Sequence, residues 1–149
     1  MAEIQGCEIP EDLYYDVEKN VWVRPETDGT VTIGMTDPAQ TYSGRILFVR
    51  LKKVGTIIPE GKGLAILESG KWTGPVRTPL TGEIVAVNEA LTTEPDLVNI
   101  DPYGEAWLVR LQPTKREQEF PLLVTGQVAV EAFRIRVAEE QIQCMRCTD

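Results

Sequence analysis

Short apolar segments rich in β-branched residues, each bounded by glycine or proline, run through the sequence as far as Pro113. We interpret these segments as strands. They lie at Val21–Arg24, Thr30–Ile33, Ile46–Leu51, Gly63–Leu67, Gly82–Asn88 and Ala106–Leu111. Asp28-Gly29 signals a tight turn between the first two, and Thr36-Asp37-Pro38 predicts a capped helical turn. Many short strands at this spacing favour a mainly β sandwich or barrel over alternating βαβ units.

The sequence changes character after Pro113. A capping-box pattern at Thr114–Glu117 predicts a short helix that Pro121 ends. Apolar residues then recur at helical spacing between 125 and 143, at Ala129, Ala132, Phe133 and Val137. This pattern predicts an amphipathic helix packed on the β core; a separate interaction element is the alternative. A length of 149 residues is typical of one domain. We expect a single domain over 1–149, with a core at about 11–112 and a helical extension at about 114–149.

Composition excludes several classes of function. The chain has no histidine, which removes Ser-His and Cys-His nucleophiles, histidine metal sites and a switch near neutral pH. A net charge of −8 argues against a nucleic-acid partner. No apolar run approaches the ~18 residues of a membrane span, and the acidic N-terminus shows no signal peptide. We expect a cytoplasmic monomer without a metal site.

Three cysteines, at Cys7, Cys144 and Cys147, are too few for a disulfide framework in a chain of this length. Cys144 and Cys147 form a C-x-x-C pattern, which is a candidate redox couple. The βαβ setting of thioredoxin-like motifs is missing, and a single pair is weak for structural zinc. Two reduced thiols at the end of a helix are an equally good interpretation.

The most informative segment, 59–87, predicts a hairpin with a lysine at its tip. Lys71 lies ten residues after Gly61 and eleven before Gly82. Two strands of equal reach would therefore hold it as far from the body of the protein as the segment allows. A lysine at a loop tip is ordinarily a solvated charge. The functional alternative is an attachment point, where an acyl amide carries chemistry that side chains lack.

Several motifs around this lysine resemble the H protein of the glycine cleavage system and its lipoyl-carrier relatives. The resemblance covers residues 11–112. Its motifs are Leu13-Tyr14-Tyr15, Val21-Trp22-Val23-Arg24, Ile33-Gly34-Met35-Thr36-Asp37, Ala39-Gln40, Glu68-Ser69-Gly70-Lys71, Pro79-Leu80-Thr81-Gly82-Glu83-Ile84, and the run from Pro95 to Leu108.

The resemblance implies a flattened barrel-sandwich of the lipoyl/biotinyl type with flanking helices. It also implies a carrier without turnover of its own, with lipoic acid in amide linkage on Lys71 and with Glu68, Ser69, Gly70 and Trp72 as neighbours in the attachment motif. Biotin carriers typically flank their lysine with methionine, whereas Gly70 and Trp72 stand here. We therefore expect lipoate in preference to biotin.

The sequence departs from the family's usual pattern near the expected arm. Asn20 stands where the family usually has a histidine, and an amide cannot become cationic near neutral pH. Trp72, after the lysine, could pack on a dithiolane or on the hairpin itself. The segment after the helical turn is basic rather than acidic, which suggests a different docking partner. The candidate docking residues are Arg45, Arg50, Lys52 and Lys53.

These departures resemble the lipoate-binding proteins of sulfur-oxidising bacteria and archaea. That resemblance implies an arm that carries sulfur intermediates for a heterodisulfide-reductase-like complex. Dihydrolipoate suits this chemistry because a thiolate or persulfide can open its dithiolane. The alternative is a glycine cleavage carrier of an aminomethyl group, served by the glycine cleavage enzymes and dihydrolipoamide dehydrogenase. Either carrier needs a lipoate-attaching ligase.

Two further function classes stay open at this stage. One is a thiol-disulfide enzyme that uses Cys144 and Cys147, for which Lys71 would be dispensable. The other is an interaction module that keeps the fold and has lost the arm.

Overall fold

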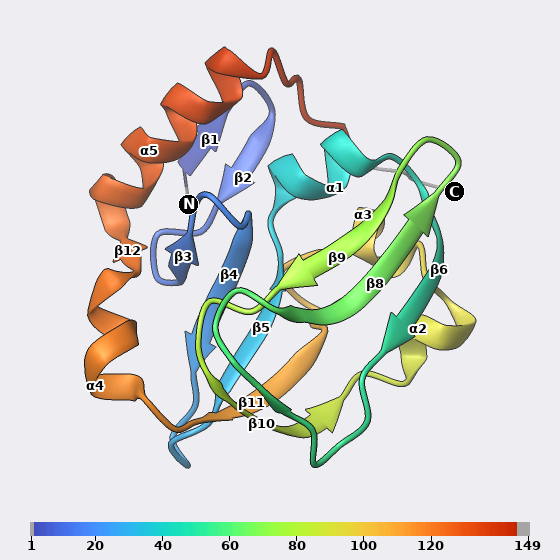
Figure 1. Ribbon diagram of the computed structural model, residues 1–149. Helices are drawn as coiled ribbons and strands as arrows, with labels where there is room; N and C mark the ends of the chain where they lie inside the picture. Colours follow the sequence, from blue (N-terminus) through green and yellow to red (C-terminus); the bar gives the residue numbers. More distant parts are fainter. Residues whose placement is uncertain (1, 146–149) are drawn as a thin grey trace.

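The structure is a computed structural model that describes residues 2–145. Its strands and helices follow one another along the chain as labelled in Figure 1. The strands are β1 Ala2–Ile4, β2 Cys7–Ile9, β3 Tyr14–Asp16, β4 Val21–Pro25, β5 Val31–Met35, β6 Ile46–Leu51, β7 Ile57–Ile58, β8 Gly63–Ser69, β9 Thr73–Arg77, β10 Gly82–Val87, β11 Val109–Pro113 and β12 Val124–Thr125. The helices are α1 Asp37–Ser43, α2 Ala90–Thr93, α3 Leu97–Ile100, α4 Arg116–Glu119, the 3₁₀ turn η1 Phe120–Leu122, and α5 Gly126–Glu139.

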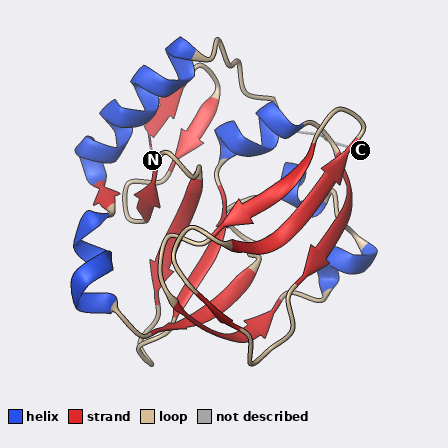
Figure 2. Cartoon of the chain, in the orientation of Figure 1, coloured by secondary structure: helices blue, strands red, loops and turns tan. Residues whose placement is uncertain are grey.

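Two antiparallel sheets enclose the main core. The larger sheet has the order β12-β3-β4-β5-β11-β10-β7, and the smaller has the order β6-β8-β9. Figure 1 shows the smaller sheet lying across β4, β5, β10 and β11, and the helices flank the strands (Figure 2). The core between the sheets is apolar, with Ile33, Leu64, Leu67, Ile84 and Leu111 fully buried. The mainly β sandwich predicted from sequence is confirmed.

Local signals placed the β4–β5 hairpin and α1 correctly. Val23 pairs with Ile33 across the hairpin, and Gly29 has the positive φ of 90° that its turn requires. The Thr36 side chain accepts a hydrogen bond from the backbone N–H of Ala39 and so caps α1, with proline in the first turn. The end of this helix lies next to the tip of the β8–β9 hairpin in the smaller sheet, where Lys71 is located.

A second apolar cluster lies outside the sandwich and holds α5. The ring of Phe133 on α5 meets Tyr15 edge to face, with the ring centroids 5.2 Å apart, and Trp22 is fully buried in the same cluster. Its N-terminal members come from the β1–β2 hairpin, where Ala2 pairs with Ile9. The prediction of an amphipathic helix packed on the β structure is therefore confirmed.

The predicted end of α5 is wrong, because the helix stops at Glu139 rather than at 143. Gln141 has a left-handed φ of 54°. The N–H of Gln141 donates to Ala138 O at 3.3 Å, and that of Ile142 donates to Val137 O at 3.0 Å. These two bonds form a Schellman motif. The motif turns residues 141–145, which we name the tail, back across the molecule.

The predicted capping box is also wrong. The N-cap of α4 is Lys115, and its side chain makes no capping bond. Thr114 instead extends the pairing beyond the end of β11, because its N–H donates to Thr81 O at 3.0 Å. Pro121 does not end the helical segment, because it lies within the 3₁₀ turn η1 directly after α4, where a missing N–H is tolerated.

A disulfide bond joins Cys7 to Cys144, with a Cα–Cα distance of 4.9 Å. The expectation that Cys144 is a reduced thiol is therefore contradicted. The reason is tertiary: the β1–β2 hairpin packs beside the end of α5, so residues 137 positions apart in sequence become neighbours. Cys147, the other half of the C-x-x-C pattern, lies outside the described residues. None of the helices in the described range 2–145 is long and apolar enough to cross a membrane.

Candidate functional site

Lys71 lies at the tip of the hairpin formed by β8 and β9, as predicted. Glu68 and Thr73 form the last pair of the ladder. Beyond them the N–H of Ser69 donates to Trp72 O at 2.7 Å and closes a turn with Lys71 inside it. Lys71 is exposed, and its amine forms no ion pair with any described residue. The amine is therefore accessible for acylation.

Ser69 organises the turn and fixes it to α1. Its hydroxyl donates to Ser43 O at 2.6 Å and accepts from the N–H of Trp72 at 3.0 Å and that of Lys71 at 3.3 Å. The hairpin tip thus rests against the end of α1, and the expectation that it lies as far as it can from the body is wrong. Sequence reasoning named Ser69 as a motif neighbour and missed this role, although serine at the start of a turn is its usual signal.

The aliphatic part of the Lys71 side chain runs beside Gly44, the residue that ends α1. A Cβ built on Gly44 would lie 3.0 Å from Lys71 Cε. Gly44 has φ 80° and ψ −172°, a combination that is essentially confined to glycine. A glycine is therefore required here by the backbone, and a larger residue would also displace the neighbouring lysine side chain.

Trp72 has one of the two roles considered from sequence, and the other, contact with a dithiolane, stays a prediction. Its ring packs on the hairpin, because a Cβ on Gly74 would lie 2.8 Å from the ring. Trp72 also lines two hollows near the hairpin tip, and Tyr42 of α1 lines both hollows with it. We name them the inner cleft and the tail groove. An aromatic surface is thus within reach of a group attached to Lys71.

The inner cleft has a volume of about 160 Å³ and is lined by Asn20 and Met35 besides Tyr42 and Trp72. Asn20 has a left-handed φ of 62°, a conformation that asparagine and histidine both adopt more readily than most residues. Its side-chain oxygen accepts a hydrogen bond from the Thr36 hydroxyl. The cleft therefore presents a fixed amide where a histidine would present a titratable ring.

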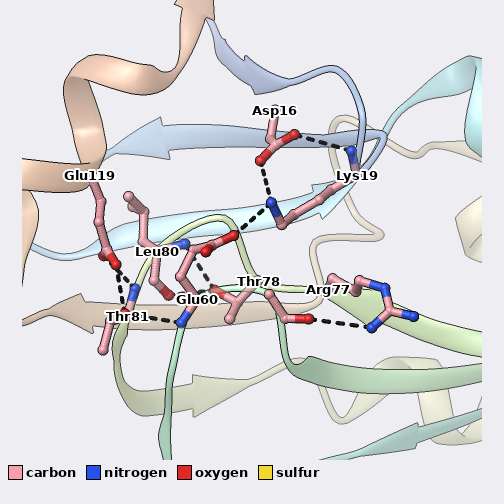
Figure 3. Close-up of polar contacts among 9 residues, drawn as sticks. Asp16, Lys19, Glu60, Arg77, Thr78, Leu80, Thr81 and Glu119 are labelled. Carbon is pink, nitrogen blue, oxygen red and sulfur yellow. Dashed lines mark hydrogen bonds and ion pairs between the residues drawn. The ribbon is translucent and has the colours of Figure 1, made fainter.

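A polar cluster fixes the opposite end of the hairpin, as Figure 3 shows. Lys19 Nζ lies 2.9 Å from an oxygen of Asp16 and 2.7 Å from one of Glu60. The carboxylate of Glu119 accepts hydrogen bonds from the N–H and hydroxyl of Thr81, both at 2.7 Å. Burial acts to lower the pKa of Lys19, but the bonds to Glu60 and Asp16 outweigh it, so this pKa is raised. The cluster ties the larger sheet and α4 to the base of the hairpin.

The structure separates the four basic docking candidates. Arg45 lies beside Lys71 and forms an ion pair with Asp96 at 2.9 Å. Arg50, Lys52 and Lys53 are exposed, line one shallow hollow along β6, and form no ion pair with the rest of the described chain. The basic surface therefore consists of these three residues, with Arg45 apart from them.

Comparisons with known proteins agree with this geometry. A sequence model of the family described as Glycine cleavage H-protein matches residues 13–134. The chain belongs to the glycine cleavage H-protein family. It is 51% identical over 148 residues to "Glycine cleavage system H protein 3" of Aquifex aeolicus, covering 97% of this chain and 92% of the relative. It is 46% identical to "Probable glycine cleavage system H protein 2" of Saccharolobus solfataricus, covering 98% and 99%.

Among solved structures, the chain is similar to a glycine cleavage system H protein from Mycobacterium marinum. The TM-score is 0.73 at 30% identity, and the match covers 90% of this chain and all of that chain. Glycine cleavage H proteins carry lipoate covalently on a lysine and act as carriers without catalytic activity of their own. Lys71 has the exposure and the position that such an attachment needs, and its amine is free of ion pairs within residues 2–145.

Proposed function

We propose that this chain is a lipoyl carrier of the glycine cleavage type, with lipoate attached to Lys71 and an aminomethyl group as its cargo. The observation that carries the proposal is the Lys71 amine, exposed and free of described ion pairs at a hairpin tip that Ser69 fixes to α1. Membership of the H-protein family supports it.

The residues of this chain present the arm and supply no catalysis of their own. The rigid turn holds the Lys71 backbone while the side chain projects to solvent, so a ligase and later partner enzymes can reach it. Lipoate in amide linkage supplies a dithiolane, which adds redox chemistry that the side chains around it lack. Trp72 and Tyr42 provide an apolar surface on which that group can rest when it is not engaged.

The attachment is tested by exposing the purified chain to a lipoate-attaching ligase and measuring its intact mass. We expect one lipoyl increment, which peptide mapping places on Lys71. Lys71→Arg should abolish the increment, because arginine keeps the charge and cannot form the amide. Lys62→Arg is the matched control, since Lys62 is an exposed lysine in the turn before β8. A modified Lys71→Arg variant, or an unmodified native chain, contradicts the proposal.

The cargo needs its own experiment. The named relatives favour glycine cleavage over the sulfur-transfer interpretation. Sulfur transfer stays as a second candidate because Asn20 lines the inner cleft in place of the expected histidine. Glycine decarboxylase and glycine should give the lipoylated chain an aminomethyl adduct, detected by intact mass. A sulfur adduct formed with a persulfide donor, together with no aminomethyl adduct, would reverse the assignment.

We further propose that the basic surface at Arg50, Lys52 and Lys53 docks an acidic partner enzyme, with Arg45 a weaker candidate because Asp96 pairs with it. Complementary charge raises the rate of encounter and falls off with salt. Reversing Arg50 and Lys52 to glutamate should slow cargo transfer, most strongly at low ionic strength. Reversing exposed Lys115 and Arg134 makes the same change in net charge at the start of α4 and on α5, neither of which pairs with β6. Equal rates for the two double variants would refute the docking assignment.

A further inference from the structure

The tail groove is a second hollow beside Lys71, and it shares Trp72 and Tyr42 with the inner cleft. Three parts of the chain meet there: the end of α1, the hairpin tip and the tail. From the tail, Ile142 and Met145 contribute apolar side chains, and Lys71 itself lines the hollow. The attachment point therefore opens directly into this groove.

The tail is held in place along its length. The N–H of Cys144 donates to Gln5 O at 3.0 Å in the β1–β2 turn. Further along, the side-chain amide of Gln40 donates to Met145 O at 2.7 Å. Figure 1 shows this segment running from the end of α5 to α1. The tail thus forms a defined wall of the groove.

The disulfide fastens this wall covalently. Cys144 lies between Ile142 and Met145, the two apolar residues that the tail gives to the groove, and its partner Cys7 is fully buried in the N-terminal cluster. Opening the disulfide would leave the wall held by its hydrogen bonds to Gln5 and Gln40 and by the burial of Ile142. The shape of the groove is therefore linked to the state of the disulfide.

The size and chemistry of the groove suit a small, partly apolar group with an amide. Its volume is about 580 Å³, compared with about 160 Å³ for the inner cleft, and ligand sites typically measure roughly 300–1,000 Å³. Tyr42 is 56% exposed and Met145 is 73% exposed, so apolar surface faces the groove uncovered. The side-chain amides of Gln141 and Gln143 can hydrogen-bond a polar link, whereas the Thr41 hydroxyl is already bonded to Gln40 and to the backbone of Met145. The Glu140 carboxylate also lines the groove.

We propose that the tail groove is a seat for the lipoyl group on Lys71 and that the Cys7–Cys144 disulfide fastens its wall. The proposal rests on the proposed lipoylation of Lys71. The dithiolane packs against Met145, Trp72 and Tyr42, and the arm amide lies along the polar side. The closed disulfide keeps the wall in place beside the seated arm, and replacing the two cysteines removes that fastening.

Two methionines make the proposal testable by NMR, because Met35 lines the inner cleft and Met145 lines the tail groove. The full chain is labelled at the methionine methyl groups, with its disulfide closed, and is compared before and after lipoylation. Intact mass first establishes the lipoyl increment on Lys71. We expect the Met145 methyl resonance to shift and to show NOEs to the lipoyl protons, while Met35 stays unchanged. A shift at Met35 alone, or at neither methionine, overturns the proposal.

Two variants test the wall. Cys7→Ser/Cys144→Ser, lipoylated and folded, should lose the lipoyl NOEs to Met145; NOEs of native intensity would refute the role of the disulfide.

Met145→Glu keeps the disulfide and adds a charge at the groove, and it should remove the lipoyl NOEs to the Tyr42 ring. Val128→Glu is the control, because Val128 is an exposed apolar residue on α5 that lines none of these hollows. Retained NOEs in Met145→Glu contradict the seat even if the double serine variant fails to fold. An absent mass increment would instead refute the lipoylation itself, and the seat with it.

Discussion

The hydroxyl of Ser69 donates a hydrogen bond to the carbonyl of Ser43 at 2.6 Å, and this bond joins the hairpin that bears Lys71 to the end of α1. Both residues are buried, so water competes little for the bond. The same hydroxyl accepts from the N–H groups of Trp72 and Lys71. One side chain therefore sets both the shape of the turn and its place on the protein.

Ser69→Ala should destabilise the protein by about 1–3 kcal/mol, because the buried Ser43 carbonyl loses this donor and two turn N–H groups lose their acceptor. The loosened turn should also slow lipoylation at Lys71. Urea unfolding and a time course of intact mass measure the two effects. Thr73→Ala, at an exposed position on the same hairpin, should change stability by less than about 0.5 kcal/mol. An unchanged free energy of unfolding in Ser69→Ala would show that the Ser69–Ser43 hydrogen bond does not stabilise the fold.

Gly44→Ala should destabilise by about 1–3 kcal/mol, since φ 80° and ψ −172° place Gly44 where other residues are strained. The new Cβ would also displace the Lys71 side chain, which can move at little cost because it is flexible and exposed. Urea unfolding measures the loss. Gly29→Ala is the comparison, because Gly29 has a φ of 90° with nothing within 4 Å of a built Cβ. If lipoylation slows in Gly44→Ala and not in Gly29→Ala, the displaced lysine is the cause. If Gly44→Ala loses less free energy of unfolding than Gly29→Ala does, the strain argument is contradicted.

The raised pKa of Lys19 predicts a loss of stability at alkaline pH. A folded-state pKa above the unfolded value means that this lysine stabilises the fold fully below its ordinary pKa of 10.5, and that the contribution disappears as the pH rises through the raised value. The free energy of unfolding, measured by urea from neutral pH to above 10.5, should therefore fall. Lys19→Met should show a shallower fall, since it has no charge to lose next to Asp16 and Glu60. Parallel curves for the two proteins would rule out this lysine as the cause.

Reducing the Cys7–Cys144 disulfide should lower the free energy of unfolding by about 2–5 kcal/mol, because the bond closes a loop of 137 residues in the unfolded chain. Urea unfolding with and without a reductant measures the change, and thiol titration checks that the bond has opened. Cys7→Ser/Cys144→Ser should unfold near the reduced native protein and should not respond to the reductant. A disulfide shown to be open, with no change in the unfolding midpoint, would contradict the prediction.

Local sequence signals predicted those elements whose hydrogen bonds close within a few residues. Asp28-Gly29 placed the β4–β5 hairpin because a tight turn needs a residue that tolerates positive φ. Thr36 and Pro38 placed the start of α1 because a capping oxygen and a fixed φ act within one turn. The two glycine turns placed Lys71 at a hairpin tip for the same reason.

The errors came where a distant strand or helix competed for the same backbone groups. Thr114 carries the first residue of a capping box, yet its N–H pairs with Thr81 across the sheet. The helix predicted from sequence extends to residue 143, yet a left-handed Gln141 ends it and lets Ile142 pack inward. In both cases long-range pairing and burial outweighed a weak local preference.

The sequence by itself determined the β-rich architecture, the first turn of α1 and a lysine presented at a hairpin tip, because each depends on turn chemistry and side-chain alternation that are local. The tertiary structure decided what surrounds that lysine. Ser43 and Gly44 come from the end of α1 and the tail follows α5, and they meet beside Lys71 in a fold where the N-terminal hairpin packs on α5 and Cys7 is joined to Cys144. A groove made from such distant segments has no local signature, since the burial that assembles it is a property of the whole fold.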